Sequence, residues 1–303
     1  MAGFILIDGK NIAYAAQSAN KLYVGDQEVQ AIYGFIRTIK SVISRYPTLK
    51  PIVLWDGISW RHGVFKEYKA ARIKDETKSQ QKMNEERAAL NKQIPIIMKA
   101  LEILGVDQMK ADNYEADDLA GLLVSKFKNE TILLLSGDKD WVQLVSNKVT
   151  WFDPMRDVMI TPKNIEDILG VSTPTQWLEF RVLKGDVSDN ISGVGGIGDV
   201  GAKTLLKEYG SVTGFINQYL DGTIKDLPKK FEALATDDTK MELYRRNIML
   251  MDLTSTAIPK PVNLKIIKGN LDESGFELLC ERLAFKSVLS NLHDWLYPFR
   301  KNK

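Results

Sequence analysis

The sequence is poor in the residues on which several kinds of chemistry depend. Cys280 is the single cysteine among 303 residues, and His62 and His293 are the only histidines. One cysteine excludes an internal disulfide and a cysteine-based zinc site, and two histidines make a histidine-centred mechanism unexpected. No run reaches about eighteen apolar residues, so we expect no transmembrane helix and no membrane partner. The chain starts directly with a strand-like run and lacks the layout of a signal peptide, so we expect a cytoplasmic protein.

Charge and apolar content are close to those of an ordinary globular protein. Hydrophobic residues make up 44% of the chain, which is enough for a sizeable core, and the length fits one large domain or two smaller ones. There are 41 Lys and Arg residues against 39 Asp and Glu residues. This balance alone is a weak indication of nucleic acid binding. If many acids gather in one pocket, however, the remaining surface is more basic than the total suggests.

Three short apolar runs rich in β-forming residues each end at acidic residues. The runs are residues 4–7, 51–55 and 131–135, and the acids that follow them are Asp8, Asp56, Asp138 and Asp140. Helical periodicity separates the first two runs, so we predict an α/β fold with a central, mostly parallel sheet flanked by helices. Ligands of such sheets lie beyond the carboxyl ends of the strands, where these acids fall.

A further acidic cluster, in the segment 114–120, is the most informative stretch of the chain. Glu115, Asp117 and Asp118 lie within four residues at the start of an expected helix. A helix N-terminus stabilises an acid or two by only about 0.3–1 kcal/mol each, so three acids need outside cations. A single Asp-Gly pair after a strand is ordinarily a turn. Three acidic strand ends together with this cluster predict a shared site for Mg²⁺ or Mn²⁺.

The segment 61–100 is rich in Lys and Arg. It reads either as a solvated, salt-bridged helical face or as a contact surface for nucleic acid. Lys69 and Arg72 are three residues apart and share a helical face. Tyr68 beside them offers a ring on which a base could stack. Cations and an aromatic ring beside a metal site suit a nucleic acid phosphate.

Two more acids, Asp186 and Asp189, precede a glycine-rich loop over residues 193–198. Helices are expected on both sides, at 175–184 and 200–209. A dinucleotide-binding turn would follow a strand, so a clamp on the DNA backbone fits this pattern better. The clamp candidates are Gly193, Gly196, Ile197, Gly198, Lys203 and Lys207. We expect a mostly helical tail, with helices near 212–220, 239–249 and 273–291 and with Leu278, Leu279, Leu283, Val288 and Leu289 in the core.

Taken together, these motifs resemble the structure-specific 5′ nuclease family of flap endonucleases and 5′–3′ exonucleases. In size, and in lacking a polymerase domain, the chain is most similar to the stand-alone bacteriophage members. The matching segments are 8–11, 56–57, 67–72, 114–118, 136–140 and 185–198. They cover roughly residues 4–210 and occur in the order of the family.

The resemblance implies a PIN/resolvase-like nuclease core over residues 1–172, with a helical arch at about 66–98. A helical DNA-binding domain would follow over residues 173–303. It would contain a helix–three-turn–helix clamp at about 175–210, which often holds a K⁺ ion. Many members have a lysine where this chain has Val200, and proline where it has Gly195.

The resemblance also implies roles for the site residues. Two Mg²⁺ or Mn²⁺ ions would be bound, and Lys69 would contact the scissile phosphate with Arg72 nearby, while Lys74 in the arch would contact DNA. One ion would be held by Asp8, Asp56, Glu115 and Asp117, and the other by Asp117, Asp138, Asp140 and Asp186, with Asp118 and Asp189 close by.

The implied function is hydrolysis of phosphodiester bonds at 5′ flaps, nicks or 5′ ends of duplex DNA, and of RNA primers in RNA–DNA hybrids, in replication or repair. We expect a monomer in a bacterial cell or a phage-infected host, with a polymerase or a single-strand-binding protein as a partner. A catalytically inactive DNA-junction binder is the alternative, and it predicts missing metal ligands. An aspartate-nucleophile phosphatase would need Asp-x-Asp at the first strand end, where Asp8 is followed by Gly9 and Lys10.

Overall fold

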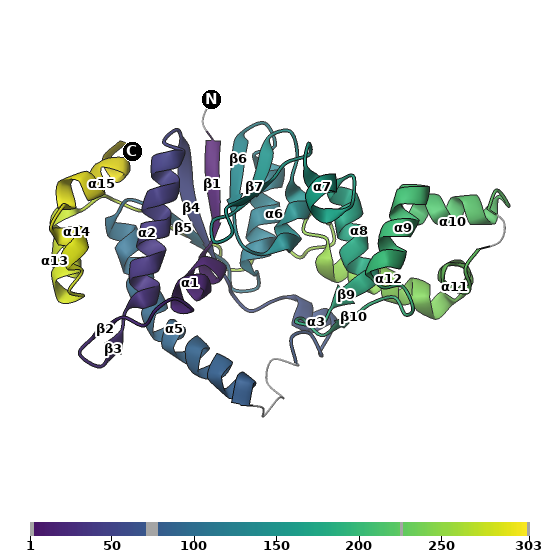
Figure 1. Cartoon of the computed structure of the whole chain (residues 1–303), viewed down its shortest axis with the longest axis horizontal. Coiled ribbons are helices and arrows are strands. Elements are labelled where there is room, and N and C mark those ends of the chain that lie inside the picture. The colour runs from purple at the N-terminus through teal and green to yellow at the C-terminus, as the bar shows by residue number, and fades with distance from the viewer. Residues whose placement is uncertain (1–2, 71–77, 225–226, 302–303) are drawn as a thin grey trace.

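A seven-stranded sheet forms the centre of the protein. Its architecture is seen in a computed structural model that describes residues 3–70, 78–224 and 227–301 (Figure 1). The strands are β1 (Gly3–Asp8), β4 (Leu49–Trp55), β5 (Asp107–Lys110), β6 (Thr131–Leu135), β7 (Val149–Asp153), β8 (Val158–Ile160) and β11 (Lys265–Ile267). Their order is β11-β5-β4-β1-β6-β7-β8, and only the edge strands β8 and β11 run antiparallel to their neighbours. The predicted, mostly parallel α/β sheet is therefore confirmed.

Strand β1 lies at the middle of the sheet, and its residues alternate between two apolar layers. Ile5 and Ile7 belong to the layer that contains the helices α1, α2 and α5, whereas Leu6 belongs to the layer that contains α6. Both neighbours of β1 are parallel to it, with Ile5 opposite Pro51 of β4 and Leu133 of β6. The carboxyl ends of β1, β4 and β6 therefore meet at one edge of the sheet.

Helices cover both faces of the sheet. One face carries α1 (Gly9–Gln17), α2 (Gln30–Arg45), α5 (Lys78–Ile103), α13 (Glu273–Arg282), α14 (Lys286–Leu289) and α15 (Leu292–Lys301), and the other carries α6 (Ala116–Lys126), the 3₁₀ helix η1 (Lys139–Leu144) and α7 (Ile165–Leu169). Two short elements lie outside these layers, the hairpin β2 (Tyr23–Val24) with β3 (Gln27–Glu28) and the helix α3 (Arg61–Val64). Within the described ranges, no helix is both long and apolar enough to cross a membrane.

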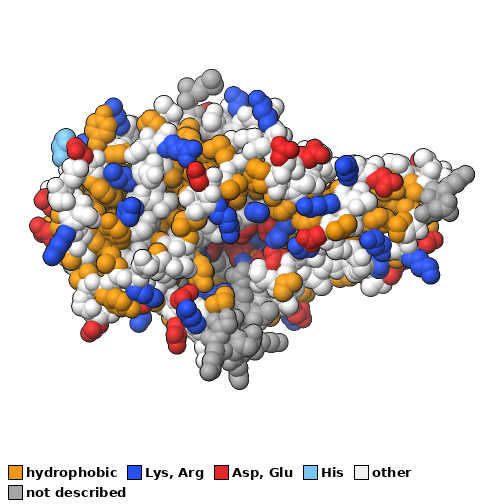
Figure 2. Space-filling view, viewed as in Figure 1, with side chains coloured by type: hydrophobic (Ala, Val, Ile, Leu, Met, Phe, Trp, Pro, Cys, Tyr) orange, Lys and Arg blue, Asp and Glu red, His pale blue; other side chains and the backbone are white. Residues whose placement is uncertain are grey.

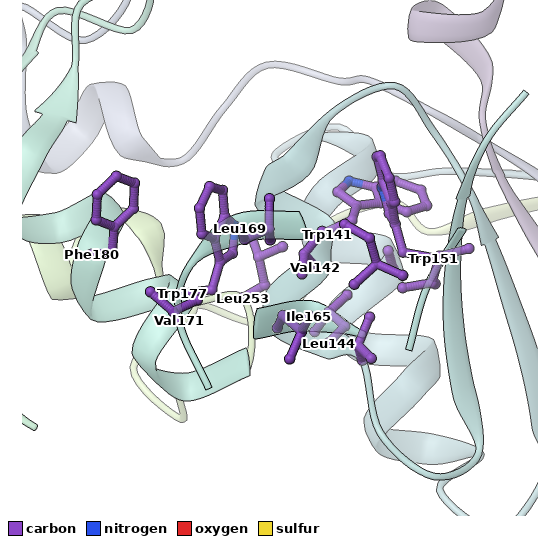
Figure 3. Packing of buried hydrophobic residues seen from close by; sticks show 14 of the residues in the cluster. Trp141, Val142, Leu144, Trp151, Ile165, Leu169, Val171, Trp177, Phe180 and Leu253 are labelled. Atoms are coloured by element: carbon purple, nitrogen blue, oxygen red, sulfur yellow. The ribbon is translucent and has the colours of Figure 1, made fainter. Parts of the chain in front are cut away.

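A helical region extends from one side of the sheet (Figure 1). It contains α8 (Pro174–Lys184), the short strands β9 (Gly185–Asp186) and β10 (Ile191–Ser192), α9 (Asp199–Tyr209), α10 (Val212–Leu220), α11 (Lys229–Thr236) and α12 (Asp238–Met251). Figure 3 shows buried side chains that continue from Trp151 in the sheet through Trp141 to Trp177 and Phe180 of α8. Trp177 also donates a hydrogen bond to the Lys139 carbonyl at 2.7 Å. The helical region and the sheet therefore share one core.

The C-terminal residues return to the sheet. Strand β11 pairs with β5, while α13 packs against α5 and α15 against α2. The predicted boundary between residues 172 and 173 stays a prediction, but the segment 265–301 lies on the sheet rather than on the helices α8 to α12.

The expected single helix at 273–291 is wrong. It is divided into α13 and α14, because Ala284 between them has a φ of 51°, outside the helical range. Leu278, which we expected in the core, is 65% exposed, since Phe276 and Cys280 make up the buried face of α13.

Candidate active site

Acidic side chains gather beyond the carboxyl ends of the central strands. Figure 2 shows them at the bottom of a hollow between the sheet and the helical region, with Lys and Arg side chains around it. A cleft of about 640 Å³ contains Asp8, Asp56, Glu115, Asp117 and Asp138 in its lining. A smaller hollow of about 20 Å³ is lined by Asp117, Asp140, Asp186 and Asp189, among others. Asp117 borders both, so the structure brings these eight predicted residues to one place.

Asp8 is fixed at the start of α1. Its Oδ1 accepts a hydrogen bond from the Asn11 backbone at 3.0 Å, and its Oδ2 accepts one from the Ser136 hydroxyl at 2.9 Å. Burial, followed by the nearby Asp56 carboxylate, raises the pKa of Asp8 to about 7. The carboxyl group is therefore held firmly, but its negative charge is poorly compensated within the protein.

The negative charges of Asp117, Asp138 and Asp140 are also poorly compensated within the protein. Asp117 accepts a hydrogen bond from the indole of Trp141 at 2.5 Å, and Asp138 accepts one from the Asp140 backbone at 2.8 Å. Burial raises the pKa of all three carboxyls, to about 7 for Asp140, and Asp138 adds its repulsion to Asp117 and Asp140. These half-buried acids are crowded with like charges.

Glu115 differs because cations surround it. Its Oε1 pairs with Lys69, and its Oε2 accepts hydrogen bonds from Tyr68 at 2.8 Å and Ser59 at 2.9 Å. Burial acts to raise the pKa of Glu115, but Lys69 and then Arg61 outweigh it and bring the pKa to about 2. Glu115 is therefore ionised in the folded protein.

Asp118 has a different role from the metal ligand that we predicted. The Arg61 guanidinium donates to its two oxygens at 2.9 and 3.0 Å, and the Trp60 indole donates to Oδ1 at 3.2 Å. Arg61 also donates to the Leu250 carbonyl at the end of α12, at 2.6 Å. Asp118 is 1% exposed and is not among the lining residues of either hollow, because it points to the side of α6 that holds Arg61. Its contacts join α6 to α3 and α12.

The loop with Lys69 is held by the turn between β9 and β10. The Lys69 backbone donates to the Asp189 carbonyl at 2.9 Å, and Asn190 donates to the Glu67 carbonyl at 2.8 Å. Lys69 has a φ of 58°, an uncommon conformation for a residue with a side chain. It lines the cleft, as predicted for a residue that contacts substrate.

The predicted stacking of a base on Tyr68 does not agree with the structure. The side chain is buried, and its hydroxyl donates to Glu115 and, at 3.0 Å, to Asp189, so no ring face is available. Arg72 and Lys74 lie outside the described residues, and the arch at 66–98 stays a prediction.

Arg181 of α8 contacts two of the predicted ligands. Its Nε lies 2.7 Å from Asp140 Oδ1, and its Nη2 pairs with Asp186 Oδ2. The first contact is close but poorly aligned, so that Asp140 Oδ1 and Arg181 Nε are both buried without a hydrogen-bond partner among the described residues. We had given Arg181 no role. Its position five residues before Asp186 is the only feature of the sequence that could have indicated its contact with the acids.

The donor set fits hard divalent cations. Carboxylate oxygens are the ligands that Mg²⁺ prefers, and the buried Asp140 Oδ1 atom lacks a hydrogen bond. As arranged in the described parts of the chain, no three His, Cys, Asp or Glu side chains could hold an ion without moving. Lys69 and Arg181 occupy several of the oxygens instead. The two predicted ligand sets stay predictions.

The glycine loop lies between β10 and α9. Gly196 has a φ of 85°, which favours glycine, while the Ile197 side chain is buried, so Ile197 offers a ligand only its backbone. Lys240 of α12, which we had not considered, donates to the Gly195 carbonyl at 2.9 Å.

Lysines also lie near the loop. Lys203 lies over the ring of Phe180 at 5.4 Å, Lys207 is exposed, and Val200 is 81% exposed. The predicted DNA contacts of Gly193, Gly196, Ile197, Gly198, Lys203 and Lys207, and the K⁺ site, stay predictions. The cleft also contains Lys10, Asn11 and Arg87, to which we had assigned no role in the site.

Family models match most of the chain. The model of the 5′–3′ exonuclease N-terminal resolvase-like domain matches residues 3–170, and that of the 5′–3′ exonuclease C-terminal SAM fold matches residues 172–267. A 5′–3′ exonuclease from Buchnera aphidicola is 28% identical over 98% of this chain and 97% of its own length. The thermostable DNA polymerase I of Thermus filiformis is 32% identical over 94% of this chain. The chain spans about a third of the length of that relative.

Solved structures show the same fold. The T5 5′-exonuclease with bound zinc ions has a TM-score of 0.69 at 21% identity, with 99% of this chain and 97% of that chain covered. Human GEN1 in complex with Holliday junction DNA has a TM-score of 0.56 at 15% identity, with 99% and 71% covered.

Proposed function

The chain belongs to the 5′–3′ exonuclease family, and we propose that it is a magnesium-dependent, structure-specific 5′ nuclease with two ions at its centre. The observation that carries this proposal is the pair of adjoining hollows that share Asp117. One is lined by Asp8, Asp56, Glu115 and Asp138, and the other by Asp140, Asp186 and Asp189. Each hollow offers oxygen donors for one ion.

The residues of this chain have separate tasks in the proposed reaction. Divalent ions, when bound, supply Lewis-acid stabilisation and a hydroxide nucleophile at neutral pH, so no histidine is needed. Asn11, Ser136 and Trp141 hold the carboxylates of Asp8 and Asp117 in fixed orientations. This orientation limits the reorganisation that is required when charge develops on the phosphate.

Lys69 is placed to contact the substrate. It lines the cleft, and its ammonium group is held by Glu115 and lies 3.8 Å from Asp189. When Glu115 serves as a ligand, Lys69 can turn to the scissile phosphate and stabilise the negative charge that grows there. Its contribution is then larger in the transition state than in the bound substrate.

We propose branched, nicked or flapped duplex DNA, and RNA–DNA hybrids, as substrates. A structure of the bacteriophage T5 flap endonuclease was solved as a pseudo-enzyme-product complex with DNA and metal ions, and its fold resembles that of this chain with a TM-score of 0.67. We also propose that the protein acts as a monomer, with a polymerase or a single-strand-binding protein as its partner. The hollow rimmed by Lys and Arg in Figure 2 supports a polyanionic substrate.

The test compares 5′-labelled flap, nicked duplex and RNA–DNA hybrid substrates, with Mg²⁺ and with EDTA. We expect cleavage that requires Mg²⁺, and binding without cleavage when Ca²⁺ replaces it. If the protein binds flaps but releases no product in Mg²⁺, it is a junction-binding protein and the nuclease proposal is wrong. A control with a 5′-labelled blunt duplex separates structure-specific cleavage from general exonuclease activity.

A further inference from the structure

Two arginines near the candidate site, the buried Arg61 and the half-buried Arg181, form ion pairs of different quality. Arg61 is satisfied, because both Asp118 oxygens accept hydrogen bonds from it and its Nε donates to a carbonyl. Arg181 is satisfied only in part: its Nη2 donates to Asp140 Oδ2 at 3.3 Å and to Asp186 Oδ2, but its Nε lies 2.7 Å from Asp140 Oδ1 without the alignment of a hydrogen bond. A misaligned contact leaves both atoms with much of their desolvation penalty. The first pair is complete, and the second pair leaves an acceptor open.

We propose that Arg181 is a displaceable counter-ion, which neutralises Asp140 and Asp186 in the metal-free protein and is released when a divalent ion binds there. The proposal rests on the proposed function, since it takes these two residues as ligands. A spherical cation can approach Asp140 Oδ1 from any direction, whereas a planar guanidinium must align its N–H groups. The site therefore suits the ion better than it suits the arginine.

The surroundings of Arg181 allow this release without unfolding. Its backbone is part of α8, which is fixed on both sides by Trp177 bonding to the Lys139 carbonyl and by Asn247 bonding to the Val182 carbonyl at 3.0 Å. Its side chain is 21% exposed although Nε itself is buried, so part of the side chain has access to water. The carboxylates can thus exchange one cation for another while the helix stays in place.

The charges around Arg181 also favour the exchange. Asp138, Asp140 and Asp186 all act on this guanidinium, so a single positive charge faces three acids. A divalent ion neutralises two of these negative charges. Without any cation the acids would repel one another, so a counter-ion protects the fold until the ion arrives.

The experiment measures Mg²⁺ and Mn²⁺ affinity by calorimetry, and melting temperature in EDTA and in saturating Mg²⁺, for Arg181→Met. Methionine keeps much of the length of the side chain but removes its charge. The variant should melt below the wild type in EDTA and match it in Mg²⁺. It should also bind the ion about tenfold more tightly, equivalent to about 1.4 kcal/mol, because the ion no longer competes with the guanidinium.

Lys139→Met is the matched control for a general change of charge. Lys139 is exposed and lies between Asp138 and Asp140 in sequence, but its backbone carbonyl alone is tied to α8. If both variants bind the ion more tightly by the same factor, the effect comes from the overall electrostatic field of the site, and the proposal is wrong. Unchanged or weaker ion binding by Arg181→Met, with a melting deficit that persists in Mg²⁺, would make Arg181 a permanent structural partner.

Two outcomes need separate treatment. If Arg181→Met does not fold even with Mg²⁺, Arg181→Lys is measured in its place. Its ion affinity should exceed that of the wild type, but by less than the roughly tenfold expected for Arg181→Met. An affinity equal to that of the wild type would again contradict displacement. If the wild type itself shows no binding heat with either ion, the metal-dependent function fails rather than the role of Arg181.

Discussion

Asp117 and Asp118 are consecutive residues of α6, yet they lie in opposite electrostatic environments. Asp118 is enclosed by Arg61 and Trp60, and its carboxylate makes aligned hydrogen bonds to both. Asp117 receives one hydrogen bond from Trp141. Burial and then Asp138, Asp8 and Glu115 raise its pKa, and Lys69 offsets them only in part. Successive residues on a helix point about 100° apart, so one helical turn can serve two regions.

The difference shows where the protein supplies its full counter-charge and where Lys69 and Arg181 supply only part of it. On the Asp118 side, the ion pair joins three segments of the chain and is complete without any ligand. On the Asp117 side, the buried Asp8 and the half-buried Asp117 and Asp140 are left with raised pKa values, which is the pattern expected of a functional site rather than of a structural one. The missing charge on that side is what a divalent ion would provide.

The largest effect is expected on the Asp118 side. Asp118→Asn removes the nearer of the two carboxylates that pair with the Arg61 guanidinium, whose side chain is 3% exposed, and leaves it only Glu115 at 3.4 Å. Removing one member of a buried pair destabilises a protein by roughly 3–5 kcal/mol. Urea unfolding should show this loss both in EDTA and in Mg²⁺, because Arg61 occupies both Asp118 oxygens and Asp118 lines neither hollow.

Asp117→Asn is the matched variant one residue earlier, and it should act in the opposite direction. It removes a half-buried charge that neighbouring acids repel, so the metal-free protein should become more stable. Turnover on a flap substrate should fall by roughly 10²–10³-fold, the range for the loss of one pre-organised electrostatic contact. If both variants destabilise the protein equally, the two regions do not differ in the way described.

The acids could be predicted from the sequence, but their counter-charges could not. Asp8, Asp56 and Asp138 follow buried strands, and the parallel pairing of those strands brings their ends together by a general rule of sheet geometry. The partners of Arg61 depend on folding over long separations, since the Leu250 carbonyl lies 189 residues away. No local pattern reports such a contact, nor the burial of Tyr68.

The raised pKa values should also make the stability of the metal-free protein depend on pH. Asp8 and Asp140 have pKa values raised to about 7 in the folded state, above the ordinary value of 3.8. Between these values the folded protein binds more protons than the unfolded chain, so stability is highest at low pH and is lost as pH rises through 7. Glu115 and Glu28, with pKa values lowered to about 2, have the opposite sign but act below about pH 4.5.

The melting temperature in EDTA should therefore decrease as the pH rises from about 5.5 to about 8. Magnesium at a hundred times its dissociation constant should add about 2.7 kcal/mol at the upper end and flatten the slope, because the ion replaces the protons. Asp117→Asn should show a weaker slope than the wild type, since it removes one of the repelling charges. A metal-free protein that gains stability from pH 5.5 to pH 8 would contradict the description of the cleft acids.

The smallest effect is expected for Lys10, a cation that could cancel the difference between the two sides of α6. Its ammonium lies 3.6 Å from Asp56 in the cleft, so it could supply the counter-charge that the Asp117 side lacks. Its side chain is 54% exposed, however, and exposed pairs contribute about 0.2–1 kcal/mol. Lys10→Met should therefore lower the metal-free stability by less than about 1 kcal/mol, and 0.5 M salt, with a Debye length of roughly 4–5 Å, should remove most of the difference. Lys126→Met, on the last turn of α6, gives the baseline for losing one exposed lysine. A loss of several kcal/mol that resists salt would mean that Lys10 neutralises the cleft, and that both sides of α6 are compensated from within.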